Sequence, residues 1–252
     1  MIILKILLAL LIYLGVPSIV LLIFPSLSAL AATGIGGLIS LPILYLLYLR
    51  DGRHRRQAVR LPYLSETVIG LLIALGWAAC TSLNGLIELT RLDGLFPAFQ
   101  ADFAGQLYGP PLYQQLLFMV LILPAVEELV FRGHIFGLMR DSFSFRVCAL
   151  TSAFLFGLMH LNITQGLYAF FLGLIMAWLY EKIHGLAAAY LFHMAANLFS
   201  VLVSNFWPGS GFFASLPVTL ALTGIGFGVM ALCLWQLKKL AAPRDSWIFN
   251  LF

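Results

Sequence analysis

Charged residues interrupt apolar segments of this chain, at positions where a membrane helix carries charge only for a reason. The apolar segment 113–139 contains Glu127, Glu128 and Arg132. One unpaired charge at the centre of a bilayer costs roughly 2.5–3.5 kcal/mol on insertion scales, so three would cost roughly 8–10 kcal/mol. A helix with these residues therefore needs internal compensation, a chemical purpose, or both.

Helix geometry gives the two adjacent glutamates different tasks. Glu128 and Arg132 are four residues apart on one helix face, so we expect them to form an ion pair. Glu127 is rotated by about 100° and points elsewhere. A carboxylate in a pocket of low dielectric constant gains basicity, which suits a general base. A buried ion pair with a spare acid at a helix interface is the structural alternative.

Two later segments carry polar side chains at the same helical spacing. Phe156 and His160 form one i, i+4 pair, and His193 and Asn197 form another. A histidine in a membrane helix can also serve as an interhelical hydrogen-bond donor. Counted at 1.5 Å per residue, Glu127 and the two histidines lie about 12–21 Å from the expected cytoplasmic helix ends. These depths are compatible with one layer near the middle of the membrane.

Composition places these residues in a bilayer. The chain has 252 residues, of which 62% are hydrophobic and 10% charged. A soluble domain has about 45–50% apolar and about 25% charged residues. We therefore expect an all-α integral membrane protein with one polytopic domain, 1–252, whose surroundings are the lipid bilayer. The net charge of +4 needs no nucleic-acid partner, because topology explains it.

Eight apolar segments predict a bundle of about eight transmembrane helices. The fifth and sixth are short, and we expect a hairpin of short helices shielded by neighbours. The stretches 50–61 and 91–111 are predicted to be loops. The eight segments lie at about 3–24, 27–49, 64–89, 113–139, 146–162, 165–180, 185–203 and 216–237.

Positive charges predict the orientation. With eight spans, twelve Lys and Arg residues fall on one side of the membrane and Arg91 falls on the other. The positive-inside rule then places both termini in the cytoplasm. We expect a multi-pass protein of the plasma membrane, or of the endoplasmic reticulum membrane in a eukaryote. The twelve residues are Lys5, Arg50, Arg53, Arg55, Arg56, Arg60, Arg140, Arg146, Lys182, Lys238, Lys239 and Arg244.

The first apolar segment resembles a signal peptide in part, with Lys5 ahead of a long apolar run. That run exceeds the usual signal-peptide core of about 7–15 residues. We expect a retained helix, and cleavage would leave the rest of the topology unchanged.

The three groups of polar residues described above form motifs whose order along the chain resembles that in the family of CAAX-processing and bacteriocin-processing (CPBP, Abi) intramembrane proteases. The resemblance covers roughly 113–203, which is the expected catalytic core. It implies a hydrolase, an intramembrane endopeptidase that cleaves a peptide bond in a membrane-associated peptide or protein. The motifs are Glu-Glu-x-x-x-Arg (Glu127, Glu128, Arg132), Phe-x-x-x-His (Phe156, His160) and His-x-x-x-Asn (His193, Asn197).

The resemblance implies catalytic roles that agree with the chemistry of the residue types. Glu127 would be the general base that activates a water, with help from His160. His193 and Asn197 would stabilise the oxyanion that develops on the scissile carbonyl, because imidazole and amide N–H groups are suitable donors.

The remaining motif residues would support these four. Glu128 and Arg132 would fix the helix of the general base, and Phe156 would pack beneath His160. The first three spans and the eighth carry no recognisable signature, so substrate specificity does not follow from the resemblance.

Metal dependence stays open at the level of sequence. Members of the family have been classed as metalloproteases, and Glu127, His160 and His193 could bind zinc. The helix signature His-Glu-x-x-His is absent from the sequence, and the resemblance equally fits a metal-free, glutamate-dependent protease. We favour the metal-free form, with no cofactor.

Two other functions remain possible readings of the same residues. Intramembrane acids and histidines also form proton relays in transporters, although this sequence lacks the inverted repeats of many transporters. The chain could also be a non-catalytic immunity or scaffold membrane protein. Intact motifs argue against that third function.

Overall fold

The computed structural model describes residues 2–54, 64–95, 97–183, 185–207 and 211–241. Regular structure in these residues is helical throughout, which confirms the predicted all-α class. Among the charges used for orientation, Arg55, Arg56, Arg60 and Arg244 lie outside the described residues. The longer helices are α1 (Ile2–Ile23), α2 (Ala29–His54), α3 (Glu66–Thr90), α4 (Pro97–Tyr108), α8 (Phe145–Leu158), α9 (Ile163–Lys182), α10 (Leu186–Phe206) and α11 (Leu216–Leu240).

A continuous helical rod occupies the fourth predicted span. The residues that join its five pieces all have right-handed helical backbone angles, so the rod is unbroken from Leu112 to Met139. We call it the central rod. Its pieces are α5 (Leu112–Gln114), η2 (Gln115–Ile122), α6 (Leu123–Glu128), η3 (Leu129–Phe136) and α7 (Gly137–Met139).

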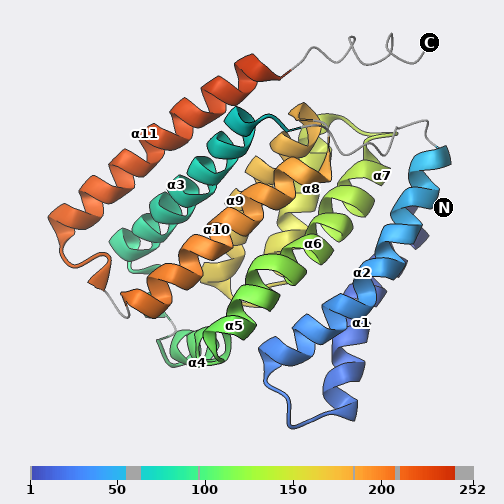
Figure 1. Ribbon diagram of the computed structural model, residues 1–252, viewed down its shortest axis with the longest axis horizontal. Helices are drawn as coiled ribbons and strands as arrows, with labels where there is room; N and C mark the ends of the chain where they lie inside the picture. The colour runs from blue at the N-terminus through green and yellow to red at the C-terminus, as the bar shows by residue number, and fades with distance from the viewer. Residues whose placement is uncertain (1, 55–63, 96, 184, 208–210, 242–252) are drawn as a thin grey trace.

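The apolar segments predicted from the sequence all appear as helices. Six of the described helices, α1, α2, α3, α9, α10 and α11, are long and apolar enough to cross a membrane. Figure 1 shows these helices packed side by side, with α1 and α2 at one edge and α11 at the other. The start of α1 and the end of α11 point toward the same end of the bundle (Figure 1). Which side of the membrane that end faces stays a prediction.

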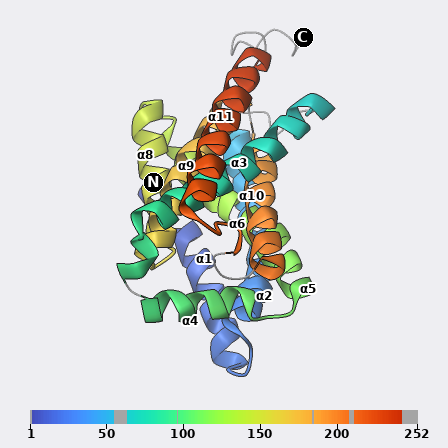
Figure 2. The same cartoon turned by 90° about the vertical axis from the view of Figure 1, so that its left-hand side faces the viewer.

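Four local expectations were wrong in whole or in part. Helix α9 has 20 residues and is not short, whereas α8 has 14 and ends at Leu158. His160 therefore lies in the turn after α8 and not within a helix. The predicted loop 91–111 contains η1 (Leu92–Leu95) and α4, which lies across the direction of the other helices (Figure 2). Residues 50–54 of the other predicted loop continue α2.

Helices α8 and α9 form the hairpin that the sequence predicts at this place. Asn162 caps α9, because its Oδ1 accepts the backbone N–H of Gln165 at 3.1 Å. Two glycines let the helices touch: a Cβ on Gly157 would lie 2.5 Å from the carbonyl oxygen of Gly166. This close approach brings the end of α8, and with it His160, against the body of the bundle.

The core of the bundle surrounds the second half of the central rod. Every residue from 128 to 138 is buried, so other helices enclose this part of the rod on all sides. Phe131 and Ile135 of the rod pack in one apolar cluster with Met176 of α9 and Phe192 of α10. The Glu-Glu-x-x-x-Arg motif begins where this enclosed part begins.

Candidate active site

Glu127 and Glu128 lie where the winding of the central rod changes. The flanking stretches η2 and η3 are π-helical, and the N–H of Leu123 bonds to the carbonyl of Phe118, five residues earlier. Pro124 has no N–H, so the turn before the glutamates lacks one α-helical hydrogen bond. π-Helical turns are rare and are frequent at functional sites. The glutamates thus project from a short α-helical piece between two widened stretches.

The ion pair predicted within the first motif is present and buried. Arg132 Nη1 donates to Glu128 Oε1 at 2.9 Å, and the two side chains are 0% and 1% exposed. Arg132 Nη2 donates to the carbonyl of Gly173 in α9 at 3.1 Å. The guanidinium also lies over the ring of Phe156 in α8, 4.7 Å from its centroid. Arg132 therefore neutralises Glu128 and ties the rod to α8 and α9.

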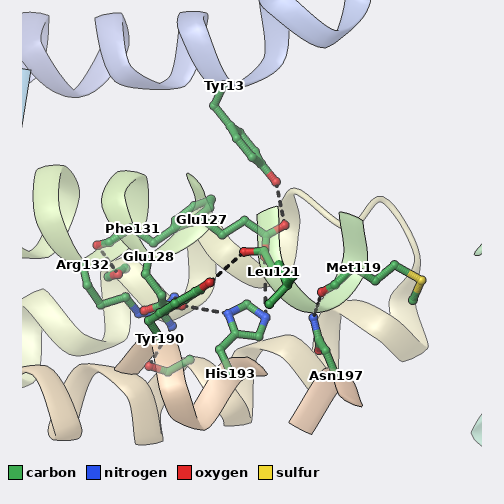
Figure 3. Close-up of polar contacts among 12 residues, drawn as sticks. Tyr13, Met119, Leu121, Glu127, Glu128, Phe131, Arg132, Tyr190, His193 and Asn197 are labelled. Carbon is green, nitrogen blue, oxygen red and sulfur yellow. Dashed lines mark hydrogen bonds and ion pairs between the residues drawn. The ribbon is translucent and has the colours of Figure 1, made fainter. Parts of the chain in front are cut away.

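Glu127 points away from this arginine, as predicted, and meets two other helices. Its Oε1 accepts a hydrogen bond from the hydroxyl of Tyr13 in α1 at 3.2 Å. Its Oε2 lies 3.6 Å from Nε2 of His193 in α10 (Figure 3). The side chain of Glu127 is 12% exposed, against 1% for Glu128. Of the two glutamates, Glu127 is the more accessible.

His193 bridges the two adjacent glutamates. Its Nδ1 lies 2.9 Å from Glu128 Oε1, and its Nε2 faces Glu127. Because Glu128 is paired with Arg132 and accepts hydrogen bonds as a carboxylate, Nδ1 carries the proton in this contact. Nε2 is then the nitrogen that can exchange a proton with Glu127.

Phe156 connects the second motif to the third. Its ring packs edge-on against His160, with centroids 5.0 Å apart, and against His193, with centroids 5.6 Å apart. His160 Nδ1 also bonds to the carbonyl of Phe156 at 2.9 Å. Among the described contacts, His160 is thus joined to Phe156, whereas His193 is the histidine that faces Glu127.

Helix α10 is attached to the central rod at three successive levels. The hydroxyl of Tyr190 donates to the carbonyl of Leu121 at 3.1 Å, and His193 contacts the glutamates. Asn197 Nδ2 donates to the carbonyl of Met119 at 2.8 Å. Figure 3 shows these side chains pointing from α10 toward the rod. The two motif residues of α10, His193 and Asn197, therefore both face the central rod.

The residues that could bind zinc do not form a metal site. Within the described part of the chain, no group of three His, Cys, Asp or Glu side chains lies together as metal ligands would. Both nitrogens of His193 face carboxylates, and Nδ1 of His160 is bonded to a backbone carbonyl. A catalytic zinc ion needs three protein ligands that converge on one open position. This arrangement of Glu127, His160 and His193 does not fit one.

Sequence reasoning missed the contributions of Tyr13, Met119 and Gly173. The last two act through backbone carbonyls, which leave no trace in residue type. Tyr13 offered one signal, because it lies in the middle of α1, whereas membrane tyrosines concentrate near helix ends. A hydroxyl at mid-helix requires a partner, and here the partner is Glu127.

Comparison with known proteins finds a family match for the segment that contains all three motifs. Residues 109–199 match the family model described as "Type II CAAX prenyl endopeptidase Rce1-like". The UPF0177 protein YxdF of Lactococcus lactis subsp. lactis is 33% identical over 100 residues. That alignment covers 39% of this chain and 53% of the relative, so the chain matches about half the length of the relative. No solved structure matches at a significant level.

These matches confirm the resemblance deduced from the motifs, and with the long apolar helices they indicate a membrane protein. Residues 109–199 of this chain are thus similar to the Rce1-like type II CAAX prenyl endopeptidases, and the match covers the segment with all three motifs.

Proposed function

We propose that the chain is an intramembrane endopeptidase of the CAAX-protease type, which hydrolyses a peptide bond in a membrane-associated peptide or protein. The observation that carries this proposal is the different treatment of two adjacent glutamates. Glu128 is buried and neutralised by Arg132, whereas Glu127 is partly exposed and faces an imidazole. A structural ion pair explains Glu128 but leaves Glu127 unexplained.

Glu127 is the proposed general base. A base must reach the proton that it removes, directly or through one water, and the 12% exposure of the Glu127 side chain supports this role. Its carboxylate would take a proton from water as the water oxygen attacks the scissile carbonyl. His193 Nε2, 3.6 Å away, can receive this proton and return it to the amine that leaves when the C–N bond breaks.

Asn197 and His193 are the proposed oxyanion donors. The amide of Asn197 has two N–H bonds, and Nδ2 uses one of them on the carbonyl of Met119. The second can donate to a tetrahedral oxyanion, and removal of one such donor typically costs about 10²–10³-fold in kcat. His193 becomes a donor at Nε2 once it holds the proton from Glu127. His160, packed on Phe156, is proposed to assist Glu127 in activating the water.

The test is a comparison of Glu127→Gln and His193→Ala with wild type, by cleavage of a membrane protein co-expressed with each variant. Both variants should insert and fold but lose cleavage. The matched control is Glu88→Gln, which changes an exposed acid of α3 and should retain activity. Normal cleavage by Glu127→Gln would exclude the proposed base. Proton flux into liposomes that disappears in Glu127→Gln would instead favour a transporter.

A further inference from the structure

Helix α1 lies outside the segment 109–199 that matches the family, yet it contributes a polar partner of Glu127. We propose that Tyr13 is a positioning residue for Glu127, which makes α1 a functional part of the active site. This inference rests on the endopeptidase function proposed above.

Two contacts with the central rod hold Tyr13 in place. Its hydroxyl donates to Glu127 Oε1 at 3.2 Å. Its ring meets the ring of Phe131 edge-on, with centroids 5.8 Å apart and an interplanar angle of 84°. Phe131 is one helical turn beyond Glu127 and is completely buried, so it provides a fixed surface for the tyrosine ring. The phenol is therefore oriented by the same piece of rod that carries the base (Figure 3).

Packing alone does not require the hydroxyl. Helix α1 is strongly apolar, and only 11% of its most apolar stretch is buried against other parts of the chain. Most of its surface therefore faces outward. Its other polar side chains have structural partners: Lys5 pairs with Asp51 of α2, and Ser18 bonds to the carbonyl of Leu14 in its own helix. A phenylalanine, a residue type that occurs 21 times in this chain, would fill nearly the same volume as Tyr13. The oxygen atom is what distinguishes this residue.

The hydroxyl assigns a separate task to each oxygen of the Glu127 carboxylate. Tyr13 occupies Oε1, and Oε2 is directed toward His193. The titratable groups around the carboxylate are His193 of α10 and, behind it, the ion pair of Glu128 and Arg132. Helix α2 also packs on α6, but its charged residues begin at Arg50, near its C-terminal end. Without Tyr13, Oε1 would lose its donor and the carboxylate could rotate away from the reactive orientation.

The experiment compares Tyr13→Phe with wild type as full chains in detergent, with a panel of quenched fluorescent peptides attached to a membrane anchor. The hydrogen bond to the Glu127 carboxylate contributes free energy that holds the base in its reactive orientation. Its loss should lower kcat by about tenfold. KM should stay within about twofold, because Tyr13 contacts the base and not the substrate. The matched control is Tyr108→Phe, which removes the 2.7 Å hydrogen bond to Ser200 and should leave kcat unchanged.

Two outcomes would overturn the inference: wild-type kcat in Tyr13→Phe, or an equal fall in kcat in Tyr108→Phe. Glu127→Gln, measured beside them, separates this failure from failure of the proposed function. If Glu127→Gln still cleaves, the base is wrong. If Glu127→Gln is inactive and Tyr13→Phe is fully active, only the positioning role is wrong.

A double-mutant cycle on melting temperature tests the same contact without any substrate. Tyr13→Phe and Glu127→Ala should have non-additive effects, because each removes the same hydrogen bond. Strictly additive shifts would contradict an interaction between the two side chains.

Discussion

Arg132 and His193 share one acceptor, Oε1 of Glu128, and each lies 2.9 Å from it. The arginine belongs to the central rod and the histidine to α10, so a single carboxylate oxygen fixes two elements of the site. In the described structure the second oxygen, Oε2, is buried without a hydrogen-bond partner. Glu128 is therefore expected to matter for stability and for the orientation of His193, whereas Glu127 is expected to matter for the reaction itself.

The variant Glu128→Gln should lower the free energy of unfolding by about 3 kcal/mol, because it leaves the buried guanidinium of Arg132 without its counter-charge. The amide can still accept a hydrogen bond, which places the loss at the lower end for a broken buried pair. Glu127→Gln should change stability by less than about 1 kcal/mol. Melting temperatures in one detergent check both values, and equal losses would contradict the division between the two glutamates.

Phe156→Leu should reduce activity at least tenfold while the protein remains folded. The leucine fills part of the buried volume but removes the ring that contacts Arg132, His160 and His193. Small displacements of catalytic groups can cost about 10²-fold in rate.

The control is Phe136→Leu, since Phe136 is equally buried and packs edge-on against Phe145 and Tyr180, away from the motif residues. Both variants should lose similar stability, less than the roughly 3–5 kcal/mol of a Phe→Ala change. Equal activities in the two variants would show that the Phe156 ring does not hold the histidines in a functional arrangement.

Metal chelation should leave peptidase activity unchanged. Within the described residues no three His, Cys, Asp or Glu side chains come together as metal ligands would: His193 faces Glu127, whereas Nδ1 of His160 is bonded to the carbonyl of Phe156. The measurement is the cleavage rate before and after dialysis against a chelator, followed by addition of zinc. A loss of activity that zinc restores would show that these side chains rearrange to bind metal.

Much of the fold follows from the sequence because hydrophobic length and helical spacing are local properties. Seven helices and the central rod appear within a few residues of the predicted spans, and the pair of Glu128 and Arg132 follows from i, i+4 geometry. Helix α4 was missed because polar and small residues mix with apolar ones in 97–108, and the segment resembles a loop.

The detailed geometry of the site depends on contacts between distant parts of the chain. Tyr13 is 114 residues from Glu127, and Asn197 is 78 residues from the carbonyl of Met119. No spacing rule encodes such pairs, because they arise from the packing of α1 and α10 on the central rod. The sequence singled out His160 and His193 as candidates and placed Phe156 beside His160, but it could not predict that His193 would be the histidine facing Glu127.

Gly173→Ala tests whether close packing behind Arg132 supports the site. The carbonyl of Gly173 accepts a hydrogen bond from the guanidinium of Arg132. A Cβ at position 173 would lie 3.0 Å from Ala153 and 3.2 Å from Arg132 Nη2. Alanine normally stabilises a helix interior by about 1 kcal/mol relative to glycine. The same change at Gly224 of α11, where a Cβ meets nothing within 4 Å, should show that gain.

At position 173 the effect of alanine on stability should be the opposite, a loss instead of a gain. The added methyl group must displace α8 or Arg132, so Gly173→Ala should lower both the melting temperature and kcat. Paired melting curves and cleavage rates for the two variants provide the comparison. If Gly173→Ala is as stable and as active as Gly224→Ala, the contact between α9 and the guanidinium does not constrain the Glu128–His193 arrangement, and the position of His193 must depend on α10 and the rod alone.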